Sequence, residues 1–427
     1  MLTRKAERSR GFFLPLVPFN AAVSAVSTLV PLYILSVGGS VLDVGFASVA
    51  YSLALIPAPL LWGRVCDVTG SRRNVMLLAT ALLLTATVSM YLSDSLAVIV
   101  LAFAAVAHAT GMMSPPLNLL IIENLPKAEW DKGYTRSSWY STIGTVSGLA
   151  TGLVWELFFP LTSFLIVCSA LAVASIALTA ALVRDPPITI ERRTMVVSRQ
   201  AFVGRLTQLP LMFVRLPRMA DFRAVAKLAK EGLTRDIPVI IVASSLFSAS
   251  LNVFFTSYTP YLKLNHLADW EVYFTSMYVN TMNGVASRYV LTRLKGTVSP
   301  SVASGALAVR AVGMLLAAVL SVFVKGQETL YTTLLVFTLL GLAYTIITID
   351  LNSLFYRALP AGRQGGMLGV YSTANGVALF AGSLASGYIS FYLGYPFTFF
   401  VAGMLVLLSA TVLQAHFGGS PPPPEDD

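Results

Sequence analysis

Apolar stretches of about 20 residues recur along the whole chain, separated by short segments that carry charges, glycine or proline. An α-helix rises about 1.5 Å per residue, so roughly 20 apolar residues span the hydrocarbon layer of a membrane. With 56% hydrophobic and 11% charged residues, the chain cannot cover a water-soluble surface with polar groups. The sequence therefore predicts an all-α membrane protein with spans at residues 12–36, 41–62, 74–93, 96–122, 137–159, 161–183, 237–262, 270–291, 299–323, 329–356, 366–392 and 395–415.

Basic residues are concentrated in alternate loops. Of the 29 Lys and Arg residues, 26 lie before span 1, in the loops after spans 2, 4, 6, 8 and 10 or, in the case of Arg288, at the loop end of span 8. Only Lys263 and Lys325 lie in loops on the opposite side. Because cytoplasmic loops retain Lys and Arg, we expect both termini in the cytoplasm and the protein in the plasma (inner) membrane of a prokaryote. The net charge of +9 then reflects this bias and does not indicate nucleic-acid binding.

A long polar stretch divides the spans into two sets of six. We expect an N-terminal six-helix bundle at residues 1–184, a cytoplasmic linker at 185–236, a C-terminal six-helix bundle at 237–416 and a disordered tail at 417–427. The linker mixes apolar and basic residues as amphipathic helices on a membrane surface do. A simple connector is the plainer interpretation, and a regulatory or partner-binding role is the alternative.

The two halves share a sequence echo. Leu117-Asn118 and Leu125-Pro126 in and after span 4 recur at identical spacing as Leu351-Asn352 and Leu359-Pro360 in and after span 10. Tyr140-Ser141-Thr142 in span 5 is repeated as Tyr371-Ser372-Thr373 in span 11. Such repeats are typical of membrane proteins built from two similar halves with a binding site at their interface.

The loop after span 2 carries the most specific motif of the chain. Two glycines permit a tight turn and close helix approach, an aspartate can charge-match a helix amino terminus, and two arginines can lie at the membrane boundary. This segment, from Gly63 to Arg73, is similar to the signature loop of the major facilitator superfamily. The resemblance implies two pseudo-symmetric six-helix bundles and a conformational latch formed by Gly63, Asp67, Gly70, Arg72, Arg73 and, from the loop before span 11, Arg363. An ordinary tight, positively charged turn is the alternative.

Other features depart from this family pattern. The corresponding loop after span 8 lacks the aspartate, and Ala107 stands where the proton antiporters of the family place an arginine before the glycine of span 4. Gly144, Gly148 and Gly152 in span 5 resemble the antiporter glycine helix without its proline. We expect these glycines to serve close helix packing.

The resemblance also implies that spans 1, 4, 7 and 10 line a central cavity. Polar residues at helical spacing in spans 1, 4 and 8 agree with a polar path, although packing between helices explains any single one. The candidate cavity and substrate residues are Asn20, Ser24, His108, Asn118, Tyr140, Tyr258, Asn280, Asn283, Asn352, Tyr371 and Asn375.

Ionisable residues within spans are costly by about 2.5–3.5 kcal/mol and are therefore functional candidates. His108, Asp350 and Arg310 are the candidates for coupling transport to an ion. A hydrogen-bonded structural role is the alternative for His108. An ion pair between Arg310 and Asp350, or a solvated position near the surface for Asp350, is the alternative for those two residues.

These features predict a secondary active transporter that moves a small neutral or amphipathic solute by alternating access, with proton coupling left open. A proton-driven exporter of hydrophobic compounds is the alternative within the class, and a membrane sensor or intramembrane enzyme is the alternative outside it. The sequence contains neither GxSxG nor HExxH, and Cys66 and Cys168 fit neither a disulfide framework nor a metal site, so we expect no enzyme activity, no cofactor and no metal. The expected partners are the solute, the lipid bilayer and protons, with a monomeric chain.

Overall fold

A computed structural model describes residues 11–125, 129–185, 236–293, 300–358 and 364–417 of the chain. Within these ranges it leaves out the side chains at 67–68, 131, 288–293, 364–366 and 368–369. The described residues form helices and no strand, which confirms the predicted all-α class.

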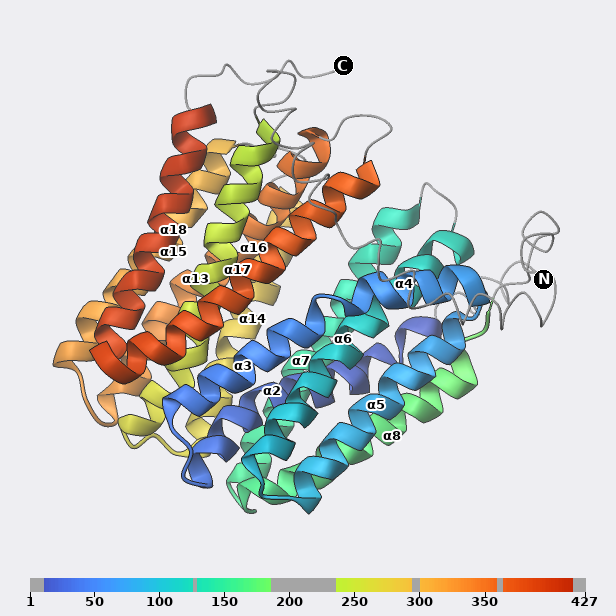
Figure 1. Cartoon of the computed structure of the whole chain (residues 1–427), viewed down its shortest axis with the longest axis horizontal. Coiled ribbons are helices and arrows are strands. Elements are labelled where there is room, and N and C mark those ends of the chain that lie inside the picture. Colours follow the sequence, from blue (N-terminus) through green and yellow to red (C-terminus); the bar gives the residue numbers. More distant parts are fainter. Residues whose placement is uncertain (1–10, 126–128, 186–235, 294–299, 359–363, 418–427) are drawn as a thin grey trace. The chain divides into compact units, whose positions relative to one another are not determined.

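Each predicted span corresponds to a helical segment (Figure 1). The first half contains η1 (Gly11–Phe13), α2 (Leu16–Ser36), α3 (Val41–Leu55), α4 (Ala58–Thr69), α5 (Arg72–Leu92), α6 (Leu96–Asn124), α7 (Trp130–Glu156), η3 (Leu161–Ser163) and α8 (Phe164–Leu182). The second contains α13 (Asp236–Leu264), α14 (Asp269–Arg293), α15 (Pro300–Phe323), α16 (Glu328–Ala358), α17 (Gln364–Leu393) and α18 (Tyr395–Phe417). Ten of these described segments are apolar and long enough to cross a membrane. The helices α7 and α14 are also long enough, but their polar residues make them less apolar than the other ten.

Two helices differ from the prediction. Span 2 is not one helix, because it breaks after Leu55 and restarts as α4 at Ala58. Pro57 and Pro59 explain the break, since proline has no N–H to donate and its ring clashes with the preceding turn. Span 5 begins at Trp130, seven residues before the predicted start, because polar residues continue the helix beyond the apolar run.

Contacts divide the chain into two compact units. Unit 1 comprises the described residues within Met1–Tyr33 and Ala50–Leu216, and unit 2 comprises those within Ile34–Val49 and Pro217–Asp427. The segment Ile34–Val49 therefore packs with the second half of the sequence. Within unit 2, this segment packs directly against α17. A Cβ added at Gly45 would lie 2.9 Å from the Cα of Gly387, so the backbones of α3 and α17 are in contact there.

Glycines bring the first and fifth spans of unit 1 into contact. A Cβ at Gly144 would lie 2.4 Å from the carbonyl oxygen of Val17, and one at Gly148 would lie 2.1 Å from that of Ala21. Any side chain at these positions would force α2 and α7 apart. This geometry confirms close helix packing at Gly144 and Gly148.

Candidate functional site

The signature loop is a tight turn between α4 and α5. Gly70 ends α4 with φ of 68°, and its N–H donates to the carbonyl of Cys66 at 3.0 Å. This left-handed conformation strains residues with a Cβ, which explains the glycine at this position. Gly63, in contrast, lies in α4 where an added Cβ would make only an ordinary 3.8 Å contact with Pro115, so packing within unit 1 does not require glycine there.

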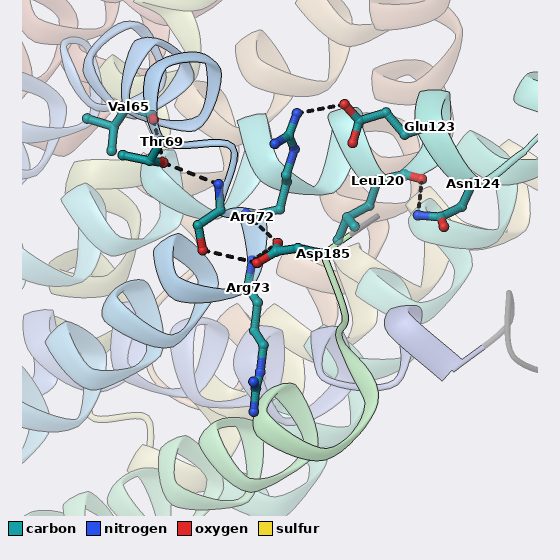
Figure 2. Close-up of polar contacts among 9 residues, drawn as sticks. Val65, Thr69, Arg72, Arg73, Leu120, Glu123, Asn124 and Asp185 are labelled. Atoms are coloured by element: carbon teal, nitrogen blue, oxygen red, sulfur yellow. Dashed lines mark hydrogen bonds and ion pairs between the residues drawn. The ribbon is translucent and has the colours of Figure 1, made fainter. Parts of the chain in front are cut away.

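Arg72, the first residue of α5, points into unit 1 (Figure 2). The residue is 4% exposed, and its Nη2 donates to Oε1 of Glu123 on α6 at 2.6 Å. A buried cation is stable only when an anion compensates its lost hydration, and Glu123 supplies that charge. The ion pair therefore joins the adjoining ends of α5 and α6.

Asp185 caps the amino terminus of α5 from the end of the sixth span (Figure 2). Its Oδ1 accepts hydrogen bonds from the backbone N–H groups of Arg72 at 2.7 Å and Arg73 at 2.9 Å, and its Oδ2 accepts one from the Ser71 hydroxyl at 3.1 Å. The carboxylate also complements the positive end of the helix dipole. Arg73 reaches in the opposite direction and donates from Nη2 to the carbonyl of Ala180 at 2.7 Å.

Sequence reasoning missed Asp185 and Glu123, because neither lies in the signature loop. The only local signal is that each is an acidic residue at the end of an apolar span, on the side where basic residues gather. The predicted latch residues Asp67, by its side chain, and Arg363 lie outside the described parts of the chain, so their role stays a prediction.

His108 joins α6 to both pieces of the broken second span. Its Nε2 lies 2.9 Å from the indole Nε1 of Trp62 on α4, and its Nδ1 lies 3.1 Å from the carbonyl oxygen of Ala54 on α3. An indole can only donate and a carbonyl can only accept, so these partners fit a neutral imidazole that carries its proton on Nδ1. Adding a proton to Nε2 would break the contact with Trp62, and this geometry supports the structural role of His108.

The other candidates of unit 1 belong to α2, α6 and α7. Asn20 donates to the carbonyl of Leu16 and lies 3.4 Å from the Ser141 hydroxyl, while Ser24 lies 3.1 Å from the carbonyl of Thr145. These two residues therefore join α2 to α7. Tyr140 is partly exposed and stacks on Phe13 with ring centroids 5.9 Å apart, and Asn118 is exposed on α6.

Three candidates of unit 2 form one polar network across α13, α16 and α17. Tyr371 donates its hydroxyl to Oδ1 of Asn352 at 3.0 Å. The Ser244 hydroxyl lies 3.0 Å from both the Tyr371 hydroxyl and Oδ1 of Asn375. Ser244 was not predicted, because a lone serine in an apolar span gives no signal of its partners.

Tyr258 is buried among aromatic rings of unit 2, and its assignment to the cavity stays a prediction. It is 4% exposed, its ring lies within 4.7–5.2 Å of the rings of Phe254, Phe337 and Phe399, and its hydroxyl donates to Thr333 at 3.1 Å. The aromatic neighbours bury the ring, while Thr333 satisfies the hydroxyl.

Asn280 and Asn283 are partly exposed on α14, but their side chains differ in hydrogen bonding. Asn280 donates to the carbonyl of Ser276 at 2.8 Å. The side-chain oxygen of Asn283 is buried and has no hydrogen-bond partner within the described structure. Asn283 therefore has an unused acceptor, as a residue that contacts a solute would.

Arg310 and Asp350 do not pair, which corrects the ion-pair interpretation. Nη1 of Arg310 donates to the carbonyl of Leu340, ten residues before Asp350 on α16. Ten residues correspond to about 15 Å of helix, which is beyond the reach of one contact. The Asp350 side chain is buried at 5% exposure, and its Oδ2 has no hydrogen-bond partner among the described residues.

Residues 16–382 match the sequence profile of the Major Facilitator Superfamily. The chain belongs to this superfamily. The match covers most of the chain, so it also covers spans that carry no specific motif, and it confirms the resemblance first seen in the signature loop. Members of the superfamily are transporters embedded in membranes, and this chain is a multi-pass membrane transporter.

Solved transporters share the fold of this superfamily member at low sequence identity. The nucleoside transporter NupG is 14% identical, with 97% of this chain and 99% of that chain covered and a TM-score of 0.69. A D-xylose-proton symporter is 13% identical, with 96% and 97% covered and a TM-score of 0.69. A structure described as a proton dependent oligopeptide transporter is 12% identical, with 97% and 98% covered and a TM-score of 0.70. No curated protein sequence matches the chain.

Proposed function

We propose that this superfamily member is a secondary active transporter that moves a small neutral or amphipathic solute by alternating access. The observation that carries the proposal is the scarcity of buried charge. Among the described residues, the buried charged side chains are those of Arg72, Glu271, Arg310 and Asp350. Arg72 and Glu271 lie in the first turns of their helices, so the interior of the spans offers too few charges for a phosphate or a dicarboxylate.

The polar residues within the two units support a weakly polar path. In unit 1 they include Asn20, Ser24 and Asn118, and in unit 2 they include Asn283 and the network around Tyr371. Amide and hydroxyl groups can exchange hydrogen bonds with a solute without a charged partner. The solved relatives named above for nucleosides, D-xylose and oligopeptides agree with solutes of this size.

Asp350 is the proposed site of proton coupling. Its carboxylate is buried in α16, and one oxygen has no partner among the described residues, so the group gains from binding a proton or a cation. Two of the similar structures are described as proton-dependent or proton symporters, which supports protons as the coupled ion.

The signature loop is the proposed latch of the transport cycle. The proposed topology places both chain termini in the cytoplasm of a prokaryotic cell. Arg72 and Arg73 hold the ends of α5, α6 and α8 together through Glu123, Asp185 and the Ala180 carbonyl. These hydrogen bonds connect the ends of three helices. Connected helix ends can transmit the movement of one helix to its neighbours, as a latch requires.

Flux measurements in proteoliposomes test the transport function. Purified protein is reconstituted with an imposed pH gradient, and uptake and efflux of radiolabelled nucleosides, pentoses, dipeptides and hydrophobic cations are followed. We expect counterflow of at least one solute. If no solute moves in either direction while the protein is folded and correctly inserted, the proposed function is wrong.

Replacing Asp350 with asparagine tests the coupling role. We expect the Asp350→Asn variant to lose accumulation driven by the pH gradient and to keep solute counterflow, because counterflow needs no net proton movement. The exposed Glu328 at the other end of α16 supplies the matched control, Glu328→Gln. Accumulation by Asp350→Asn that a protonophore still abolishes would exclude Asp350 as the coupling residue.

A further inference from the structure

Arg310 lies in the middle of α15 and is fully buried within unit 2 at 1% exposure. Its guanidinium carbon lies 5.5 Å from the ring centroids of Phe247 and Tyr344 and 5.9 Å from that of Phe255. These rings belong to α13 and α16, so the side chain reaches from the ninth span towards the seventh and tenth. Aromatic faces attract a cation but accept few of its hydrogen bonds.

No carboxylate of the described residues lies within 4.0 Å of the Arg310 guanidinium. Its one hydrogen bond in the described structure goes from Nη1 to the Leu340 carbonyl, and its Nε is buried without a partner. A buried guanidinium has five N–H donors and normally pairs with an anion. Arg310 therefore has donors that neither an acid nor a sufficient set of carbonyls occupies.

The rings around Arg310 differ in burial. Phe247 is 4% exposed, whereas Phe255 and Tyr344 are partly exposed. Two of the three rings that contact the guanidinium are therefore partly exposed on unit 2. A planar guanidinium binds a carboxylate through two parallel hydrogen bonds, and aromatic rings bind the apolar remainder of such a molecule.

We propose that Arg310 binds the carboxylate of an amphipathic organic monocarboxylate, whose apolar part packs against Phe255 and Tyr344. The inference rests on the proposed transport function and narrows its solute from neutral or amphipathic to amphipathic monocarboxylates. A single buried cation without an acidic partner matches a single negative charge. A dicarboxylate would leave its second charge among apolar side chains.

Thermal unfolding of the purified full-length protein with matched probe pairs tests the inference. The pairs are 4-phenylbutyrate with 4-phenylbutyramide and octanoate with octanamide, which differ in charge and little in shape. We expect each carboxylate to raise the unfolding temperature more than its amide, because a ligand that binds the folded state stabilises it. In Arg310→Gln the apparent affinity for the carboxylates should fall about 10- to 100-fold, and the preference over the amides should disappear.

Two further variants separate binding from structure. Arg357→Gln removes an exposed positive charge from α16 and should keep the full carboxylate preference. Arg310→Met removes the uncompensated charge and keeps a long apolar side chain, so it should unfold at the same or a higher temperature without ligand and show no carboxylate preference. If Arg310 were only structural, Arg310→Met would lower the unfolding temperature and leave any preference intact.

Equal stabilisation by carboxylate and amide in the wild-type protein overturns the inference, and so does a preference that survives in Arg310→Gln. Failure of the proposed function gives a different result. If the wild-type protein shows no carboxylate preference and Arg310→Gln transports neutral solutes at the wild-type rate, the transport function stands and the Arg310 site is wrong. If carboxylates bind in a way that depends on Arg310 but no solute is transported, the Arg310 site stands and the transport function is wrong.

Discussion

Among the described residues, units 1 and 2 each bury one arginine, and they do so in opposite ways. Arg72 of unit 1 pairs with Glu123 at 2.6 Å, whereas Arg310 of unit 2 has three aromatic rings and one carbonyl around it and no acid within the described structure. Aligning Leu117-Asn118 with Leu351-Asn352 places Glu123 opposite Arg357, so unit 2 carries a basic residue where unit 1 has its acid. A buried arginine that is already paired serves structure, and one without an anion is available to a ligand.

The contact between the first and fifth spans combines close packing and hydrogen bonds in both units. In unit 1, Gly144 and Gly148 bring backbones together, and Asn20 and Ser24 hydrogen-bond α2 to α7. In unit 2, a Cβ at Gly382 of α17 would lie 2.3 Å from the Ala249 carbonyl oxygen of α13, so backbones also meet there. Unit 2 adds a line of buried hydroxyls: Ser386 donates to the Val253 carbonyl at 2.7 Å, and Ser390 donates to Ser257 at 2.6 Å.

Breaking the paired arginine should have the largest effect. We expect Glu123→Gln to lower the free energy of unfolding by about 3–5 kcal/mol, because it leaves the buried cation Arg72 without an anion. The double variant Arg72→Leu, Glu123→Leu should recover most of that loss. Chemical unfolding in detergent measures both. A loss below about 1 kcal/mol in Glu123→Gln would mean that Arg72 resembles Arg310 and needs no anion.

Adding a methyl group to the glycine contact of unit 1 should have the next largest effect. Gly148→Ala places a Cβ 2.1 Å from the Ala21 carbonyl oxygen, so α2 and α7 must separate, and we expect a loss of about 1–3 kcal/mol. Gly63→Ala is the matched control, since its Cβ has room. Equal unfolding temperatures for the two variants would show that close packing does not hold α2 on α7.

Removing the cap of α5 tests how far the ion pair depends on its surroundings. Asp185→Ala leaves the first N–H groups of α5 without their acceptor, and we expect it to cost about 0.5–2 kcal/mol. Asp185→Asn should keep part of the stability, because the amide oxygen still accepts a hydrogen bond. If Asp185→Ala and Glu123→Gln together cost no more than Glu123→Gln alone, the cap acts only through the position of Arg72.

A single hydroxyl of unit 2 should matter least. Ser386→Ala removes one donor from the buried line of hydroxyls, and hydrogen bonds between membrane helices contribute about 0.6 kcal/mol on average. We therefore expect a smaller fall in unfolding temperature than for Gly148→Ala. A larger fall would mean that the hydroxyls of α13 and α17 act as one cooperative network.

The positions of the spans were predictable because the length of an apolar run is a local property. Boundaries agree closely except in the second and fifth spans. The second span breaks at Pro57 and its second piece runs to Thr69, seven residues beyond the predicted end, and the fifth begins at Trp130 because the helix extends into polar sequence. The family was predictable from Gly70 and its neighbouring arginines, since a tight turn requires particular residues in consecutive positions.

The partners of polar side chains were not predictable in the same way. The family resemblance placed Tyr258 in a cavity-lining span but did not reveal that Phe254 of the same helix and Phe337 and Phe399 of two other helices enclose it. The depth of Arg310 and Asp350 suggested an ion pair, yet the direction of each side chain separates them. Asp185 was found only through the contact of α8 with α5.

By itself, the sequence determined the membrane environment, the number of spans, the superfamily and the few residues able to carry charge within the spans. Tertiary structure decided which of those charges are neutralised. The physical reason is that hydropathy acts along the chain, whereas the cost of burying a charge depends on atoms that distant helices bring within a few ångströms. Arg72 and Arg310 are the same residue type, and only the helices packed around them make one a structural ion pair and the other a site open to an anion.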